Sequence, residues 1–180
     1  MIFAIEKMDN TVTAFVQSNM HTPLLDKLME LFSLIGNNGV VWIVIALLLI
    51  CFHKYRTAGL TILGALVLCV LIGDIALKPL IARMRPFAAQ PGVSLLIPRP
   101  TDFSFPSGHT MSSFAAATVL FSANKRWGIC GFALASLIAF SRLYLFVHYP
   151  SDIIGGMMIG VLVALVSLKI AEFFKKYSRV

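Results

Sequence analysis

Imidazole and basic side chains occur in this sequence at spacings that suit chemistry on a phosphate. Three motifs carry them: Lys78-x6-Arg85-Pro86, Pro106-Ser107-Gly108-His109 and Ser141-Arg142-x5-His148-x3-Asp152. Together they supply three cations, two imidazoles and one carboxylate. Such a set can neutralise a phosphate, attack its phosphorus atom and move a proton.

Five residues are predicted to bind the phosphate: Lys78, Arg85, Ser107, Gly108 and Arg142. A phosphoryl group carries concentrated negative charge, and guanidinium groups bind its oxygens in pairs. Pro106 suits the first turn of a helix. We therefore expect the backbone N–H groups of Ser107 and Gly108 to be free for an anion, with the Ser107 hydroxyl as a further donor. This cradle would stabilise charge on the transferred group.

The two histidines are the candidates for the chemical steps. His148 is the candidate nucleophile, because a neutral imidazole nitrogen can attack phosphorus and form a phosphohistidine. Asp152, at i+4, is expected to hold the other ring nitrogen and to stabilise its positive charge. His109 is the candidate general acid for the leaving oxygen and then the base for water.

No metal and no other cofactor is expected in this scheme, because the three cations neutralise the phosphate. Zinc bound by the two histidines and an aspartate is the alternative. It is disfavoured because nearby cations would repel a divalent ion.

The three motifs resemble the signature of the type 2 phosphatidic acid phosphatase (PAP2) family, whose superfamily also includes vanadium haloperoxidases and bacterial acid phosphatases. The resemblance covers residues 78–152, with every signature residue in place. It implies a PAP2/haloperoxidase-like helical core and the same residue roles, with His148, His109 and Asp152 catalytic. The implied enzyme is a hydrolase of phosphoric monoesters or diphosphates.

The chain is also similar to small bacterial members that dephosphorylate undecaprenyl diphosphate, the carrier lipid of cell-wall synthesis. That similarity favours undecaprenyl diphosphate as the substrate and undecaprenyl phosphate as the product. Phosphatidylglycerophosphate, or a broad range of lipid phosphates, is the alternative.

The composition indicates a membrane protein. The 180-residue chain is 58% hydrophobic with a net charge of +7 and a mean hydropathy of +0.87. It is too apolar for an ordinary soluble domain of this size. Its basic residues lie largely in short segments between apolar runs, which indicates membrane orientation, and no nucleic-acid partner is expected.

Five segments meet or approach the length of a membrane span. They cover residues 38–52, 57–77, 107–123, 127–147 and 151–174. We predict one domain over 1–180: an all-α polytopic bundle of five or six transmembrane helices, with the bundle at 38–174. Residues 1–36 are predicted to form two amphipathic helices at the interface. Two alternatives stay open: a sixth span built from this region, or a first span that borrows residues from it.

The basic connections 53–56, 124–126 and 175–179 fall on one side of the five-span arrangement, which is predicted to be cytoplasmic. The loop 79–106 and all three motifs then face outward from a bacterial cytoplasmic membrane.

The expected partners are a lipid phosphate and membrane lipids. A transporter or channel is disfavoured, because the charges gather at one face and do not trace a path across the bilayer. The sequence sets no oligomeric state.

Four charged residues near the motifs are given smaller roles. Asp74 is expected to pair with Lys78 along one helix. Arg83 and Arg99 are expected to contact headgroups or the rim of the substrate site. Asp102 is interpreted as a loop residue.

Overall fold

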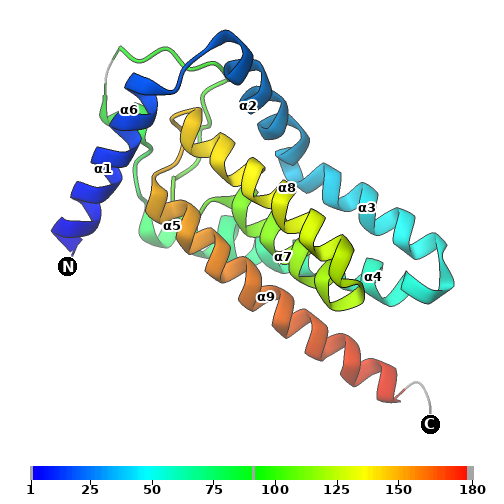
Figure 1. The fold of residues 1–180 in the computed structure, drawn as a ribbon. Coiled ribbons are helices and arrows are strands. Elements are labelled where there is room, and N and C mark those ends of the chain that lie inside the picture. Colours follow the sequence, from blue (N-terminus) through cyan, green and yellow to red (C-terminus); the bar gives the residue numbers. More distant parts are fainter. Residues whose placement is uncertain (1, 91, 178–180) are drawn as a thin grey trace.

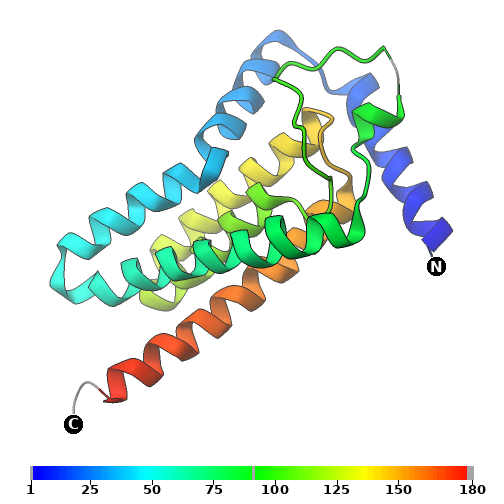
Figure 2. The same cartoon turned by 180° about the vertical axis from the view of Figure 1, so that it is seen from behind.

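The computed structural model of the protein describes residues 2–90 and 92–177, and its regular elements are helices (Figures 1 and 2). The α-helices are α1 (Ile2–Asn19), α2 (Pro23–Gly36), α3 (Val40–Cys51), α4 (Arg56–Cys69), α5 (Lys78–Ile81), α6 (Pro86–Ala89), α7 (Gly108–Ala123), α8 (Lys125–Tyr144) and α9 (Pro150–Tyr177). Two short 3-10 turns, η1 (Asn37–Gly39) and η2 (His53–Tyr55), and a π-helical stretch, η3 (Val70–Leu77), connect some of them. The predicted all-α class is confirmed.

Four stretches are long and apolar enough to cross a membrane by length and composition: Pro23–Cys51, His53–Ala89, Lys125–Tyr144 and Pro150–Tyr177. The first joins α2 to α3 through a kink, because Asn38 and Gly39 in η1 have φ of 51° and 67°. This candidate span therefore borrows residues from the preceding segment, which is one of the two alternatives that the sequence left open.

Helix α7 is shorter, with 16 residues, and lies at the centre of the bundle against α4, α8 and α9. Its contact with α9 is close at two glycines. A Cβ on Gly160 would lie 2.3 Å from the backbone oxygen of Met111, and one on Gly156 would lie 2.7 Å from that of Ser107. Small residues at this spacing let two helix backbones approach. The approach fixes the start of α7, where the second motif lies.

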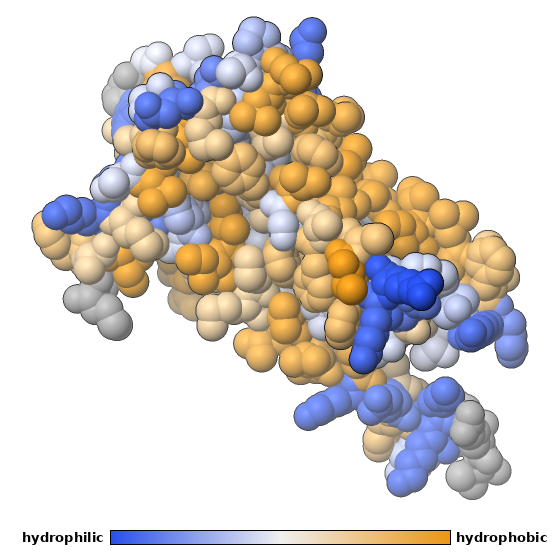
Figure 3. Space-filling view, viewed as in Figure 1, coloured by the Kyte–Doolittle hydropathy of each residue, from blue (hydrophilic) through white to orange (hydrophobic). Residues whose placement is uncertain are grey.

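The face shown in Figure 3 carries a broad apolar region, with hydrophilic residues toward both ends of the molecule. The turn from α3 to α4, the turn from α7 to α8 and the end of α9 lie at one end of the bundle (Figure 1). These are the basic connections of the sequence. The helix ends that carry the three motifs lie at the opposite end.

Helix α1 lies at the side of the bundle, where it packs against α8 and α9 (Figure 1). Its buried side chains include the polar Asp9 and Thr13, whereas Phe3 and Phe15 are exposed. The outward side of α1 thus carries large apolar side chains beside charged ones such as Glu6 and Lys7. Such an arrangement suits a helix at a membrane surface, and the interfacial location stays a prediction.

Candidate active site

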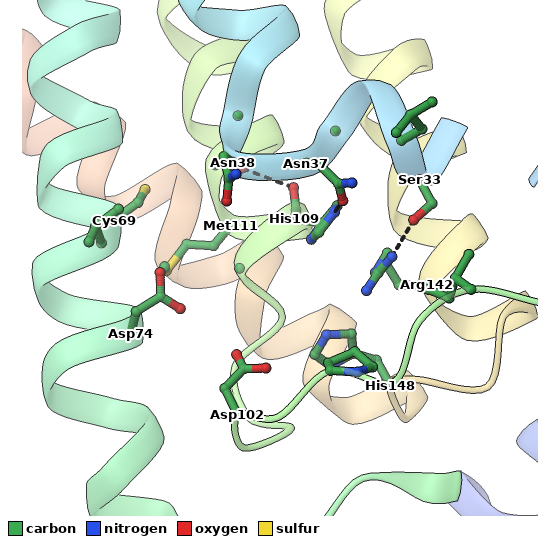
Figure 4. Close-up of a pocket in the computed structure, with 18 of the residues that line it drawn as sticks. Ser33, Asn37, Asn38, Cys69, Asp74, Asp102, His109, Met111, Arg142 and His148 are labelled. Carbon is green, nitrogen blue, oxygen red and sulfur yellow. Dashed lines mark hydrogen bonds between the residues drawn. The ribbon is translucent and has the colours of Figure 1, made fainter. Parts of the chain in front are cut away.

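A cavity of about 660 Å³ opens at the motif end of the bundle (Figure 4). Six of the eight predicted site residues line it: Lys78, Arg85, Gly108, His109, Arg142 and His148. The other two, Ser107 and Asp152, are fully buried and do not line the cavity. The fold therefore brings the three motifs together around one space.

The π-helical stretch η3 ends directly before Lys78, the first residue of α5. Gly73 within η3 packs so closely on α7 that a Cβ there would lie 2.1 Å from the Met111 side chain. Asp74 Oδ1 lies 2.5 Å from Lys78 Nζ, so the predicted pair is confirmed. Single π-helical turns often occur at functional sites.

Arg85 lines the cavity and contacts the loop that precedes α9. Its Nη1 donates to the backbone oxygen of Val147 at 2.7 Å and lies 3.2 Å from His148 Nε2. A guanidinium group can only donate hydrogen bonds, so Nε2 must accept and therefore carries a lone pair. The other nitrogen, Nδ1, then carries the proton of the neutral ring. This tautomer is the one a nucleophilic Nε2 requires.

His148 is only 2% exposed. Burial lowers its pKa to about 4, opposed by Asp152 and assisted by the charges of Arg85 and Arg142. The imidazole is therefore neutral at pH 7. A neutral ring is needed for attack on phosphorus.

Asp152 lies behind His148 but holds it less directly than the sequence predicted. Its Oδ2 is 3.5 Å from Nδ1, longer than an ordinary hydrogen bond, and Nδ1 has no hydrogen-bond partner among the described residues. Oδ2 instead accepts from the Ser104 hydroxyl at 2.5 Å and from the Tyr149 N–H at 2.9 Å. The Asp152 carboxylate is close enough to the His148 ring that a small shift would bring Oδ2 within hydrogen-bond distance of Nδ1.

The expectation for the backbone of Ser107 was wrong. Its N–H donates to the backbone oxygen of Asp152 at 3.2 Å, because the start of α9 packs against the start of α7. Its hydroxyl caps α7, accepting from the N–H and the hydroxyl of Thr110 at 3.5 and 2.9 Å. The first helical amides, those of Gly108 and His109, have no acceptor within the helix and are the ones left for an anion.

His109 lies across the cavity from His148 and has a partner that the sequence did not reveal. Its Nε2 lies 2.9 Å from Oδ1 of Asn37, in the turn between α2 and α3 (Figure 4). The break Gly36-Asn37-Asn38-Gly39 was visible in the sequence only as a chain interruption. Its contact with His109 depends on how α2 packs against α7 and α8.

Arg142 points into the same space from α8. Its Nη1 donates to the hydroxyl of Ser33 on α2, a partner that the sequence also missed (Figure 4). Its buried Nε has no hydrogen-bond partner among the described residues. Buried N–H groups are nearly always paired, so this one is a candidate donor to a phosphate oxygen.

Asp102 is part of the site, although the sequence interpretation assigned it only to a loop. It pairs with Lys78, and its Oδ1 accepts from Arg85 Nη2 at 2.8 Å. Partial burial opposes ionisation, but these two cations lower the pKa of Asp102 to about 2. Its carboxylate therefore stays charged and lies against two of the predicted phosphate ligands.

The expectation that Arg83 contacts headgroups or the substrate rim was wrong. Its guanidinium group bridges two buried carboxylates, those of Asp9 and Asp152, with N–O distances of 2.6 and 2.5 Å. Arg99 donates to the backbone oxygen of Val93 at 3.2 Å. The headgroup or rim contact expected for Arg99 stays a prediction. Sequence spacing gives no signal for the Arg83 bridge, because its partners lie far away in the chain.

Comparisons with known proteins agree with the motifs and the geometry. The PAP2 superfamily matches residues 54–176. An undecaprenyl-diphosphatase of Sulfolobus acidocaldarius is 36% identical over 147 residues, which are 81% of this chain and 70% of the relative. Undecaprenyl-diphosphatase BcrC of Bacillus subtilis is 28% identical over 87% of this chain and 80% of its own.

Two solved structures share the fold. The PAP2-type phosphatidylglycerolphosphate phosphatase of Bacillus subtilis aligns with a TM-score of 0.76 at 24% identity, covering 94% of this chain and 87% of that one. LpxE of Aquifex aeolicus aligns with a TM-score of 0.73 at 32% identity, covering 89% and 94%.

The family match and the more similar relatives define the class of protein. The chain belongs to the PAP2 superfamily. It is a hydrolase, a membrane lipid phosphatase of the PAP2 type.

Proposed function

We propose that this protein removes the terminal phosphate of a lipid diphosphate through a phosphohistidine on His148, without a metal, and that undecaprenyl diphosphate is the substrate. The single observation that carries the mechanism is the convergence of His148, His109 and Arg142 on one cavity. The substrate is supported by the names of the Sulfolobus acidocaldarius and Bacillus subtilis relatives. The motifs place the cavity at the end opposite the basic connections, which supports a site on the outer face of the cytoplasmic membrane.

The first step transfers the phosphoryl group. Nε2 of His148 forms a bond to the terminal phosphorus as the bond from phosphorus to the bridging oxygen breaks. His109 gives its proton to that oxygen, which leaves as the lipid monophosphate. Lys78, Arg85, Arg142 and the amide of Gly108 stabilise negative charge on the transferring oxygens, while Asp152 stabilises positive charge on the ring.

The second step releases the phosphate. His109, now neutral, takes a proton from water as the water oxygen attacks phosphorus. The N–P bond breaks, inorganic phosphate departs and Nε2 regains its lone pair. Lys78, Arg85 and Arg142, which line the cavity, neutralise the charge of the departing phosphate.

The same site would serve a lipid monophosphate, and the fold shared with the phosphatidylglycerolphosphate phosphatase makes phosphatidylglycerophosphate the second candidate. We propose one domain over 1–180 in either case, with the bundle at 38–174 and the outward loop at 79–106. Of the amphipathic helices predicted in 1–36, we propose that α1 lies at the membrane interface and that α2 continues into the first span.

The test is phosphate release by the purified protein in detergent with EDTA. The panel holds undecaprenyl diphosphate, phosphatidylglycerophosphate and phosphatidic acid, each assayed with and without vanadate. We expect EDTA-resistant, vanadate-sensitive release with the highest kcat/KM for undecaprenyl diphosphate. Loss of activity in EDTA would overturn the metal-free mechanism, and a higher kcat/KM for another lipid would overturn the substrate.

A further inference from the structure

A network of charged side chains lies outside the cavity and connects it to helix α1. Asp9 on α1 is fully buried, as is Asp152 at the start of α9. Arg83, in the loop after α5, lies between them. It donates from Nη2 to Asp9 Oδ2 at 2.6 Å and from Nη1 to Asp152 Oδ1 at 2.5 Å. None of these three side chains lines the cavity.

Asp9 also holds the first turn of α9. Its Oδ1 accepts from the N–H of Ser151 at 2.9 Å, and its Oδ2 accepts from the Ser151 hydroxyl at 2.5 Å. Ser151 directly precedes Asp152. One carboxylate on α1 therefore binds both the backbone next to Asp152 and the cation that binds the Asp152 side chain.

Burying this charged group costs free energy. Two carboxylates share one guanidinium group, so the site carries an excess negative charge in buried surroundings, which costs free energy. A structural anchor for α1 would need no carboxylate, since the C-terminal end of that helix is held by a neutral bond, from Gln17 Nε2 to the backbone oxygen of Tyr144 at 2.7 Å.

We propose that Asp9 is a positioning residue for the reaction: through Arg83 and Ser151 it holds the Asp152 carboxylate within reach of His148. This inference rests on the proposed function. With Asp9 present, Arg83 is shared and Oδ2 of Asp152 stays directed toward His148 Nδ1, 3.5 Å away. Without the Asp9 charge, Arg83 binds Asp152 alone and draws it from the imidazole, so the positive charge that forms on His148 is less well stabilised.

The experiment compares Asp9→Asn with two matched controls on the same helix. Glu6→Gln removes the same charge from an exposed position, and Gln17→Ala removes the other polar bond of α1 to the bundle. Each purified full-length variant is assayed for kcat and KM, and its unfolding midpoint is measured. Because Asp9 does not touch the cavity, we expect Asp9→Asn to lower kcat ~10- to 100-fold with KM within about twofold, as for misplaced catalytic groups. Both controls should keep the wild-type kcat.

Arg83→Lys provides a second route if Asp9→Asn does not fold. A point charge cannot bridge two carboxylates as a planar guanidinium group does, so the same fall in kcat is expected. A wild-type kcat in Asp9→Asn, or in Arg83→Lys when Asp9→Asn does not fold, would overturn the inference. An equal loss in Gln17→Ala would overturn it too, since that loss would reflect docking of α1 alone.

His148→Ala, assayed beside them, separates this inference from the proposed function. If His148→Ala is inactive and Asp9→Asn is normal, only the inference on Asp9 fails. If His148→Ala keeps its activity, the nucleophile itself is wrong, and the proposed function fails with it.

Discussion

The two imidazoles that line the cavity have different neighbours behind them. His148 lies in the wall formed by the loop between α8 and α9, fully enclosed, with the carboxylate of Asp152 3.5 Å from Nδ1. His109 lies at the start of α7 on the opposite wall, where its Nε2 meets the neutral amide of Asn37 at 2.9 Å. One ring has an anionic neighbour, and the other has an uncharged one.

This difference matches the two roles in the proposed reaction. A ring that becomes phosphorylated gains positive charge, which a carboxylate stabilises. A ring that must give up and regain a proton in each cycle works best when its pKa stays near the working pH. The Asn37 amide orients the His109 ring without adding charge beside it.

The largest expected effect comes from removing His148, the ring that has a carboxylate as its neighbour. His148→Ala should lower kcat by ~10,000-fold or more, because the covalent step disappears. The measurement is phosphate release with the unfolding midpoint as a control for folding. A variant that folds and retains a tenth of the activity would show that the nucleophile lies elsewhere.

His109→Ala should lower kcat by roughly 100- to 10,000-fold for a lipid diphosphate, the range of general acid–base catalysis. The first step needs less help when the leaving group is a weak base, so the burst of leaving group should recover with p-nitrophenyl phosphate. An equal loss of the burst for both substrates would argue against His109 as the acid.

Asp152→Asn makes the two regions alike, since both rings then have an amide partner. We expect kcat to fall by on the order of 100- to 10,000-fold, the upper figure being that known for an Asp-to-Asn change behind a catalytic histidine. Quenched-flow measurement should show a slower rise of the phosphohistidine. Wild-type kinetics would mean that the 3.5 Å contact has no catalytic part.

Asn37→Asp replaces an amide by a carboxylate, the reverse of Asp152→Asn, and should have the smallest effect. A carboxylate beside His109 favours the protonated ring, so the pH at which kcat is highest should move upward by roughly 1 to 3 units. Asn38→Asp, one residue along the same turn, is the control for added charge. An unchanged pH profile in Asn37→Asp would show that the pair does not tune the proton transfer.

Local patterns were enough to predict much of this molecule. Apolar runs marked the helices that became α3, α4, α7, α8 and α9, because hydrophobic length depends only on neighbouring residues. The i+4 pair of Asp74 and Lys78 followed from helix geometry. The motif spacing likewise gave six residues that line the cavity.

Predictions failed where a partner lay far away in the chain. The N–H of Ser107 was expected to be free, but α9 brings a backbone acceptor to it. Arg83 was expected to contact headgroups or the rim of the substrate site, but it binds two carboxylates, one on α1 and one on α9. Asp102 was set aside as a loop residue, although the loop folds back onto Lys78 and Arg85.

The sequence by itself determined the class of chemistry, since cations, imidazoles and a carboxylate at these spacings suit a phosphate and the apolar runs demand a bilayer. Only the tertiary structure decided which neighbour each ring has and which backbone amides remain free. Those choices arise from contacts between helices that are distant in the chain, where close packing and buried hydrogen bonds act over a few ångströms and leave no local pattern.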